Sequence, residues 1–226
     1  MLKCITPDWP APPQVKSCTT TRDFGSLVED INRKALIEEL NLPSKPIWLK
    51  QVHGITNVRS EPDNIDCEAD ASFSNKPNSV CVIMTADCLP VLFCDKAGKQ
   101  IAAAHAGWRG LAAGVLEETL KNFNIVSPEE ILVWLGPAIG PEKFEVGDEV
   151  REVFIKHLPE AKQAFKASRD GHWFADLYLL ARQRLAAQAV NNVYGGNFCT
   201  YTDIDRFYSF RRNKITGRMA SLIWLV

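Results

Sequence analysis

Three apolar runs follow one another closely between residues 79 and 106, and they constrain the fold more than any other part of the chain. The runs are SVCVIMTA, LPVLFCD and KQIAAAHA, and a turn-forming stretch from Asp95 to Gly98 separates the second from the third. Each run has the length of a strand and is apolar at almost every position, which is typical of strands covered on both faces. Such a sheet needs helices or a second sheet as cover, so the sequence predicts an α/β protein built in layers.

The flanking sequence supplies further elements. Apolar residues at helical spacing predict helices over 28–42, from Gly107 to near Asn124 with a Glu117–Lys121 pair on its surface, around 147–157 and around 174–189. Strand-like composition predicts strands at 15–22, 47–53, 57–61, 71–74, 129–136, 191–196, 206–212 and 218–226. No repeat or low-complexity linker divides the chain, so we expect residues 1–226 to form one domain.

Composition narrows the classes of partner. The chain carries 26 basic and 27 acidic side chains, so no net charge attracts nucleic acid or an anionic membrane. No apolar run reaches the roughly 18 residues that a membrane span needs, and the N-terminus does not resemble a secretory signal. The seven cysteines are odd in number and mostly lie in apolar text, which indicates reduced thiols, six of them core residues. We therefore expect a cytoplasmic protein that binds neither nucleic acid nor a membrane; its oligomeric state stays open.

Three residues at the ends of predicted strands could form a metal site. His53 precedes Gly54, Cys88 precedes Leu89-Pro90, and His105 precedes the turn at Gly107. Two imidazoles and one thiolate are a ligand set that suits Zn²⁺ and leaves a fourth position for water or substrate. The spacing matches no short metal-binding motif, so the alternative is two hydrogen-bonded structural histidines and a core cysteine. A metal-free variant would use Cys88 as nucleophile and His105 as base.

Other polar residues are candidates for catalysis or substrate binding. Asp87 interrupts the longest apolar stretch, so it is either a buried, paired carboxylate or a working acid/base. Arg22 and Arg109 could hold an anionic group by bidentate hydrogen bonds. Arg211 lies in RFYSFRR, which is either a stacking surface or a half-buried edge strand. Gln51, two residues before His53, is a further candidate for substrate binding.

Long motifs spread over nearly the whole chain resemble one known family. The strings are KQVHG, MTADCLPVLF, AAAHAGWRG, GPAIGP, FEVGDEV, CTYTD, FYSFRR and GRMASLIWL. They are similar to the YfiH-type laccase-domain family, also called the peptidoglycan editing factor or multicopper polyphenol oxidoreductase family. The resemblance implies a layered α/β/β/α sandwich with mixed sheets, and it implies that His53, Cys88 and His105 are metal ligands.

The family's names imply a small-molecule substrate but different activities. One is purine nucleoside chemistry, namely phosphorolysis of adenosine, inosine and methylthioadenosine with adenosine deamination. An open zinc site fits deamination, and phosphorolysis could use arginines for phosphate and Asp87 as the acid at the purine. A second is an editing amidase acting on UDP-muramyl-L-seryl peptides. A third is a copper-dependent polyphenol oxidase, but a multicopper centre needs many more histidines than the four present here. A non-enzymatic metal-binding scaffold is the fourth.

One segment departs from the family pattern. Members usually carry a glycine-rich GGVS-type loop and a SLNLG-type stretch after the TTR-like strand. This chain passes from TTTR through DFGSLVEDINRK to its first helix almost at once. The segment from Arg22 to Asn32 is therefore either a true loop deletion or lacks residues of the natural protein, and substrate contacts from Arg22 depend on which is correct.

Overall fold

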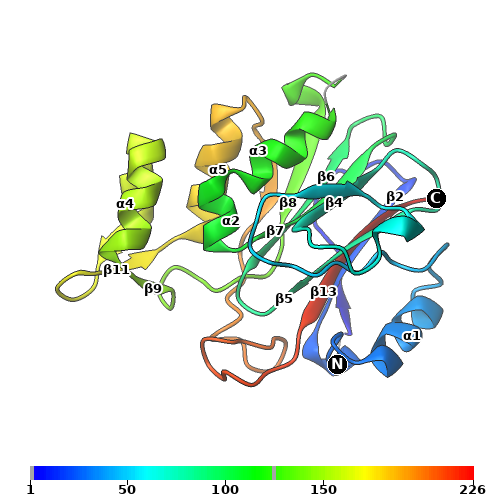
Figure 1. The fold of residues 1–226 in the computed structure, drawn as a ribbon, viewed down its shortest axis with the longest axis horizontal. Helices are drawn as coiled ribbons and strands as arrows, with labels where there is room; N and C mark the ends of the chain where they lie inside the picture. Colours follow the sequence, from blue (N-terminus) through cyan, green and yellow to red (C-terminus); the bar gives the residue numbers. More distant parts are fainter. Residues whose placement is uncertain (1–2, 124–125) are drawn as a thin grey trace.

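Two stacked sheets lie between helices in the computed structural model, which describes residues 3–123 and 126–226. In Figure 1 helices α2, α3 and α5 lie on one side of the larger sheet, and the smaller sheet lies on its other side. Helix α1 lies beyond the smaller sheet. This order confirms the layered α/β/β/α sandwich expected from the sequence.

The strands form three sheets. The larger sheet has the strand order β12 (Asn192–Gly195), β8 (Ile131–Leu135), β6 (Leu89–Asp95), β7 (Ile101–Ala106), β4 (Ala71–Ser74) and β3 (Asn57–Arg59). The smaller sheet has the order β1 (Cys4–Ile5), β2 (Val15–Thr20), β13 (Met219–Leu225) and β5 (Val80–Thr85). A third sheet joins β10 (Phe165–Ala167), β11 (His172–Ala175) and β9 (Glu145–Gly147). The helices are α1 (Asp30–Glu39), α2 (Trp108–Ala113), α3 (Val115–Leu120), α4 (Asp148–His157) and α5 (Leu177–Ala187).

The larger sheet is mixed, as expected. Strand β12 runs parallel to β8, and β3 runs parallel to β4, whereas β6 pairs with β7 and β8 in antiparallel fashion. In the smaller sheet β13 is antiparallel to both β2 and β5. The last strand of the chain therefore holds together strands that are far apart in the sequence.

The side chains of β5 show why its sequence is apolar at every position. Cys81 and Ile83 belong to the core layer between the two sheets, whereas Val80 and Val82 belong to the layer between the smaller sheet and α1. Successive residues of a strand point to opposite faces, so a strand covered on both faces has no polar side. The continuous apolar runs thus predicted β5, β6 and β7, and the structure confirms all three strands.

The helix expected from Gly107 to near Asn124 is interrupted. Gly114 has φ +106, in the left-handed region, and it separates α2 from α3. A residue without Cβ adopts this conformation at little cost, which lets the chain turn between two short helices. The expected end near Asn124 lies outside the described residues.

The Glu117–Lys121 pair expected on that helix was also wrong. Glu117 forms an ion pair with Arg184 of α5, whose side chain is only 4% exposed, and Lys121 pairs with Glu118 instead. The Arg184 guanidinium is buried, and a buried charge without a partner would lower the stability of the fold. Glu117 therefore pairs with Arg184 and not with the exposed Lys121.

Residues 47–53 were expected to form a strand and do not. Only isolated bridges occur there, from Ile47 to Cys81 and from Lys50 to Glu68. The Gln51 side-chain amide replaces a strand ladder, since it donates to the Met84 carbonyl oxygen and accepts from the Met84 backbone nitrogen, both at 2.8 Å. The segment then bends into the loop that carries His53.

Residues 206–212 were likewise expected to form a strand and form a loop. The Arg212 guanidinium donates to the carbonyl oxygens of Thr200, Tyr201 and Phe207, which stabilises an irregular backbone. Strands β9, β10 and β11 were not expected. Because β11 includes Phe174, helix α5 begins only at Leu177, with the Asp176 carboxylate accepting from the Leu179 backbone nitrogen as its cap.

No helix in the described part of the chain is long and apolar enough to cross a membrane.

Candidate metal centre

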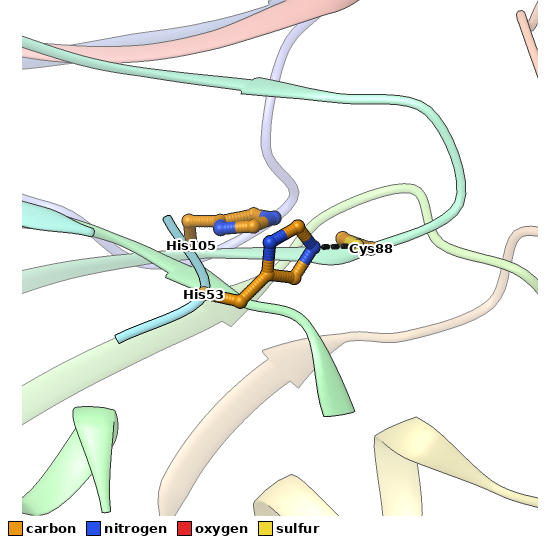
Figure 2. Close-up of side chains that lie close together, drawn as sticks. All are labelled: His53, Cys88 and His105. Carbon is orange, nitrogen blue, oxygen red and sulfur yellow. Dashed lines mark hydrogen bonds between the residues drawn. The ribbon is translucent and has the colours of Figure 1, made fainter. Parts of the chain in front are cut away.

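The side chains of His53, Cys88 and His105 meet at one end of the layer between the sheets. Their ligand atoms all lie within 4.8 Å of one another, and the Cys88 Sγ is 3.7 Å from His53 Nε2. Figure 2 shows the His53 ring pointing at Cys88, with the His105 ring beside it. The imidazole of His105 is buried, whereas His53 is exposed. The structure therefore brings together the three residues that the sequence analysis selected.

Strand register decides where His105 points. Ile101 and Ala103 of β7 face the layer between the sheets, and His105 is the next residue of the same parity. Cys88 lies in the turn between β5 and β6, next to the first residue of β6. The turn is tight, since Asp87 has φ +87, a conformation that few non-glycine residues adopt.

Asp70 holds both the His105 ring and the loop that carries His53. The sequence analysis did not select this residue. Its Oδ1 lies 2.8 Å from His105 Nδ1, and its carboxylate accepts the backbone N–H groups of Val52, His53 and Gly54 at 3.2, 2.9 and 2.7 Å. These bonds fix a loop in which His53 has φ +62. The only sequence signal was an acidic residue in DCEADAS, just before a short strand, and nothing there indicates a histidine partner.

The Asp70–His105 contact decides which nitrogen of His105 is available. With Nδ1 bound to the carboxylate, Nε2 is left for a metal, and a carboxylate behind a ligating histidine is the usual outer partner of such a ligand. A metal ion therefore fits this donor set, which has two imidazole nitrogens, one thiol sulfur and an oriented ring. Three protein ligands would leave one position open.

Cys88 and His105 shift each other's pKa in opposite directions. Burial raises the pKa of Cys88, but hydrogen bonds with His105 and His53 outweigh that effect and lower it to about 6. Burial lowers the pKa of His105, whereas the hydrogen bonds with Asp70 and Cys88 raise it to about 9. Near neutral pH the metal-free centre therefore pairs a Cys88 thiolate, the form that binds metals, with a His105 imidazolium, which must release a proton before its Nε2 can bind a metal.

Two pockets meet at this centre. The larger, with a volume of about 630 Å³, is lined by all three candidate ligands together with Gln51, Thr85 and neighbouring residues. The smaller, of about 230 Å³, is lined by His53 and Cys88 and by three cationic side chains, those of Arg109, Arg211 and Lys214. His53, Ala86, Cys88 and Phe210 line both pockets. The centre therefore lies at the boundary between a large pocket, which Lys50 and Arg218 also line, and a small pocket with three cationic residues.

Asp87 has the contacts of a buried, paired carboxylate. Its Oδ1 accepts from Thr200 Oγ1 at 2.6 Å, and its Oδ2 accepts from Ser209 Oγ at 3.0 Å and from the Arg211 backbone nitrogen at 2.6 Å. Its carbonyl oxygen accepts from the Ile139 backbone nitrogen. These bonds hold the turn that carries Cys88. Its expected role as an acid stays a prediction.

Three of the four candidate substrate-binding residues line one of the two pockets at the centre, and the fourth lines neither. Arg109 stacks on Trp108 with its guanidinium carbon 4.5 Å from the ring centroid, and Arg211 donates to the Glu145 carbonyl oxygen. Both line the small pocket. Gln51 lines the large pocket with its amide bound to Met84. Arg22 lines neither pocket, because its guanidinium donates to the Ile204 carbonyl oxygen and lies over Tyr208.

Comparison with known families identifies the group of proteins to which this fold and centre belong. The family described as "Multi-copper polyphenol oxidoreductase laccase" matches residues 17–226. The chain belongs to this family. The resemblance found in its motifs is thereby confirmed.

Relatives in the laccase family carry a different functional name. The chain is 52% identical to "Purine nucleoside phosphorylase YfiH" of Escherichia coli K12 over 247 aligned positions, which cover 100% of both chains. It is 44% identical to a "Purine nucleoside phosphorylase" of Haemophilus influenzae, with 99% of each chain covered. Homologues with this name support an enzyme.

Solved structures share the fold. A crystal structure of a Neisseria meningitidis protein of the DUF152 family has a TM-score of 0.93 at 43% identity, with 99% of each chain covered. The crystal structure of YlmD from Geobacillus stearothermophilus has a TM-score of 0.90 at 24% identity, covering 99% of this chain and 96% of that one. The second similarity concerns the fold alone.

The alignment with the Escherichia coli relative also bears on chain length. It extends over 247 positions, whereas this chain has 226 residues, so the relative carries residues that this chain lacks. In the structure the short segment after β2 closes directly onto the core: Leu27 is fully buried, and its backbone nitrogen donates to the Arg218 carbonyl oxygen. The origin of the short segment at Arg22 to Asn32 stays a prediction.

Proposed function

We propose that this chain is a metal-dependent purine nucleoside phosphorylase that cleaves adenosine, inosine and methylthioadenosine and also deaminates adenosine. The observation that carries the proposal is the position of the His53–Cys88–His105 centre between a pocket large enough for a nucleoside and a small cationic pocket. Pockets of about 300–1,000 Å³ are typical for small-molecule ligands, so the large pocket suits the nucleoside. The names of the homologues point to the same chemistry.

Phosphate is the second substrate of phosphorolysis, and the small pocket supplies its counter-charges. Arg109 and Lys214 are exposed there, and neither forms an ion pair with another described residue. Arg211 is held by Glu145 and by its backbone bond to Asp87. Guanidinium groups bind phosphate oxygens bidentately, and ammonium groups bind them as point charges. Phosphate placed there would lie next to the substrate's reacting carbon when the nucleoside occupies the large pocket.

The ligand chemistry favours Zn²⁺ as the metal. When bound, zinc would act as a Lewis acid toward a polar group of the substrate and could activate water for deamination. The protein's own part is to orient the ligands: Asp70 fixes His105 and the His53 loop, and the Asp87 network fixes the Cys88 turn. Asp87 is also the proposed acid at the purine; because it lines the small pocket and not the large one, the base would have to reach the boundary between the two pockets for this role.

Polyphenol oxidation fits the residues less well than the name of the family suggests. A multicopper centre requires several copper sites with imidazole ligands, and the chain has four histidines, of which only His53 and His105 lie at the centre. Copper bound in vitro at the His53–Cys88–His105 centre would be the source of any phenol oxidation.

The test is turnover by the purified protein with its metal content determined. Inosine plus phosphate, adenosine alone and a UDP-muramyl-L-seryl peptide are incubated separately, and the products are followed by chromatography. We expect phosphate-dependent release of hypoxanthine from inosine, and inosine formation from adenosine.

The matched variants are Cys88→Ala, which should abolish both reactions, and Cys67→Ala, which removes a half-buried thiol outside the centre and should not. Hypoxanthine release that persists in Cys88→Ala would contradict the assignment of phosphorolysis to this site. Turnover of the muramyl peptide alone would favour the amidase. Stoichiometric zinc without turnover of any of these compounds would favour a scaffold.

A further inference from the structure

The hydroxyl group of Thr85, beside the candidate metal centre, forms no hydrogen bond with another described residue. Its side chain lines the large pocket together with the three candidate ligands, and the residue is only 2% exposed. Its Oγ1 is buried without a hydrogen-bond partner among the described residues. A buried hydroxyl without a partner costs about 1–3 kcal/mol relative to a bonded one, so such a group in a native protein calls for an explanation.

Strand register directs this hydroxyl toward the centre. Cys81 and Ile83 of β5 face the larger sheet, and Thr85 is the next residue on that face. His105 ends the corresponding face of β7. Thr85 and His105 thus lie at the same end of the layer between the sheets, one from each sheet, and both line the large pocket.

The neighbouring hydroxyls of the smaller sheet behave differently. Thr19 Oγ1 is bonded to Ser221 Oγ at 2.7 Å, and Thr20 Oγ1 accepts from the Ala220 backbone nitrogen at 2.9 Å. Both are as buried as Thr85. Thr19 and Thr20 are thus satisfied within the smaller sheet, whereas Thr85, which lines the large pocket, is not. Ser72 of β4 is the other buried hydroxyl without a hydrogen-bond partner among the described residues, and it does not line the large pocket.

We infer that Thr85 is a substrate-binding residue, whose Oγ1 forms a hydrogen bond with a polar group of the nucleoside in the large pocket. This inference rests on the proposed function for the class of ligand. A hydroxyl both donates and accepts, so the partner is a ribose hydroxyl, the group at purine position 6 or a ring nitrogen. A site that offers a buried hydrogen bond discriminates against ligands that lack the matching group, because the protein group is then left unpaired.

The test measures binding of inosine in the absence of phosphate by titration calorimetry, so that no phosphorolysis occurs. Thr85→Val keeps the shape and removes the hydroxyl, and Thr85→Ser keeps the hydroxyl. We expect Thr85→Val to weaken inosine binding about 3- to 30-fold, as the loss of one such hydrogen bond implies, and Thr85→Ser to restore most of the affinity.

Stability separates a binding role from a structural one. Thr85→Val should leave the urea midpoint unchanged or raise it, because no bond within the protein is lost. Thr19→Val, the matched control, should lower the midpoint, because Ser221 loses its partner, and should leave inosine binding unchanged. A lowered midpoint in Thr85→Val with unchanged inosine affinity would overturn the inference.

Analogues identify the contacted group. Inosine analogues that each lack one ribose hydroxyl, the 6-oxygen or one ring nitrogen are bound to wild type and to Thr85→Val. The analogue that lacks the contacted group should bind both proteins equally well. An equal effect of Thr85→Val on every analogue would contradict a direct contact.

The same measurements separate this inference from the proposed function. If inosine binds wild type and is not cleaved when phosphate is added, phosphorolysis fails while the Thr85 contact is still decided by the variants. If phosphorolysis occurs and Thr85→Val binds inosine as wild type does, only the Thr85 inference fails. If wild type does not bind inosine, both are overturned.

Discussion

Asp70 Oδ1 and His105 Nδ1 lie 2.8 Å apart in the protein interior, where their side chains are 0% and 4% exposed. The same carboxylate accepts three successive backbone N–H groups of the loop that carries His53. Burial raises the pKa of Asp70, but the hydrogen bonds with His105 and the backbone of Gly54 and Val52 outweigh it, so the pKa lies below its usual value. One acidic residue thus positions two of the three candidate ligands.

Asp70→Asn should weaken zinc binding about 10- to 100-fold, the usual effect of losing the outer partner of a ligating histidine. An amide group lacks the charge and one of the two acceptor oxygens that hold His105 and the loop. Zinc affinity is measured by competition with a chromophoric chelator. Glu68→Gln is the control, since Glu68 is an exposed acid paired with Lys50. Equal zinc affinity in Asp70→Asn and wild type would show that Asp70 does not orient the ligands.

Gly107→Ala should separate two of the ligands. A Cβ at this position would lie 2.8 Å from His53 Cδ2 and 3.1 Å from Cys88 Sγ, closer than van der Waals contact allows. We expect zinc affinity to fall by about tenfold or more, which corresponds to about 1.4 kcal/mol. Gly54→Ala is the matched control, because its Cβ would meet Asp70 at an ordinary 3.4 Å. If the two glycine variants bind zinc equally, the close packing around Gly107 is not needed for the site.

Cys88 should react with iodoacetamide at unusually low pH in the metal-free protein. Its pKa of about 6, set by hydrogen bonds with His105 and His53 that outweigh burial, predicts half-maximal reactivity near pH 6, whereas an ordinary thiol titrates near 9. Because the folded pKa of Cys88 lies below its unfolded value, its contribution to stability is lost as pH falls through about 6. The raised pKa of His105 has the opposite sign, so its contribution is lost as pH rises through about 9, and the pair stabilises the fold most between these values.

Mass spectrometry of the alkylated peptide measures the rate of this reaction at each pH. Zinc should suppress it, and Cys88→Ala should remove it. A half-maximal rate near pH 9 in the metal-free protein would contradict the thiolate.

Glu117→Gln should lower the free energy of unfolding by about 3 kcal/mol, as expected when a buried ion pair loses one charge and leaves the other uncompensated. The remaining charge is the Arg184 guanidinium between α3 and α5. Urea denaturation measures the change. Glu118→Gln, which breaks the exposed pair with Lys121, should change it little. Equal effects of the two variants would mean that the buried pair contributes no more than a surface pair.

Asp87→Asn distinguishes an acid from a positioning residue. Three donors point at this carboxylate, so the amide must place an N–H against at least one of them, and the denaturation midpoint should fall. If Asp87 only holds the Cys88 turn, kcat falls and the pH profile keeps its shape. If Asp87 protonates the purine, the variant loses the decline of kcat at high pH. The pH dependence of inosine phosphorolysis in both proteins is the measurement.

The sequence by itself determined the layers of the fold and the three candidate ligands. The apolar runs of β5, β6 and β7 require cover on both faces, and the hydrophobic effect acts on that pattern whatever the detailed packing. His53, Cys88 and His105 became candidates through their positions at the ends of predicted strands, and the resemblance to the family is what implied that they are metal ligands. Helices α1 and α4 were also predicted correctly, because the helical spacing of their apolar residues marks the face that each helix buries.

Only the tertiary structure decided how the site is held and which segments stay irregular. Asp70 lies 17 residues from His53 and 35 from His105, and its role exists only because β4 and β7 pair in one register. Residues 47–53 and 206–212 look like strands, yet backbone N–H groups of the first segment bond to the Asp70 side chain, and the Arg211 N–H of the second bonds to the Asp87 side chain. Such long-range hydrogen bonds override local preference, and no pattern along the chain records them.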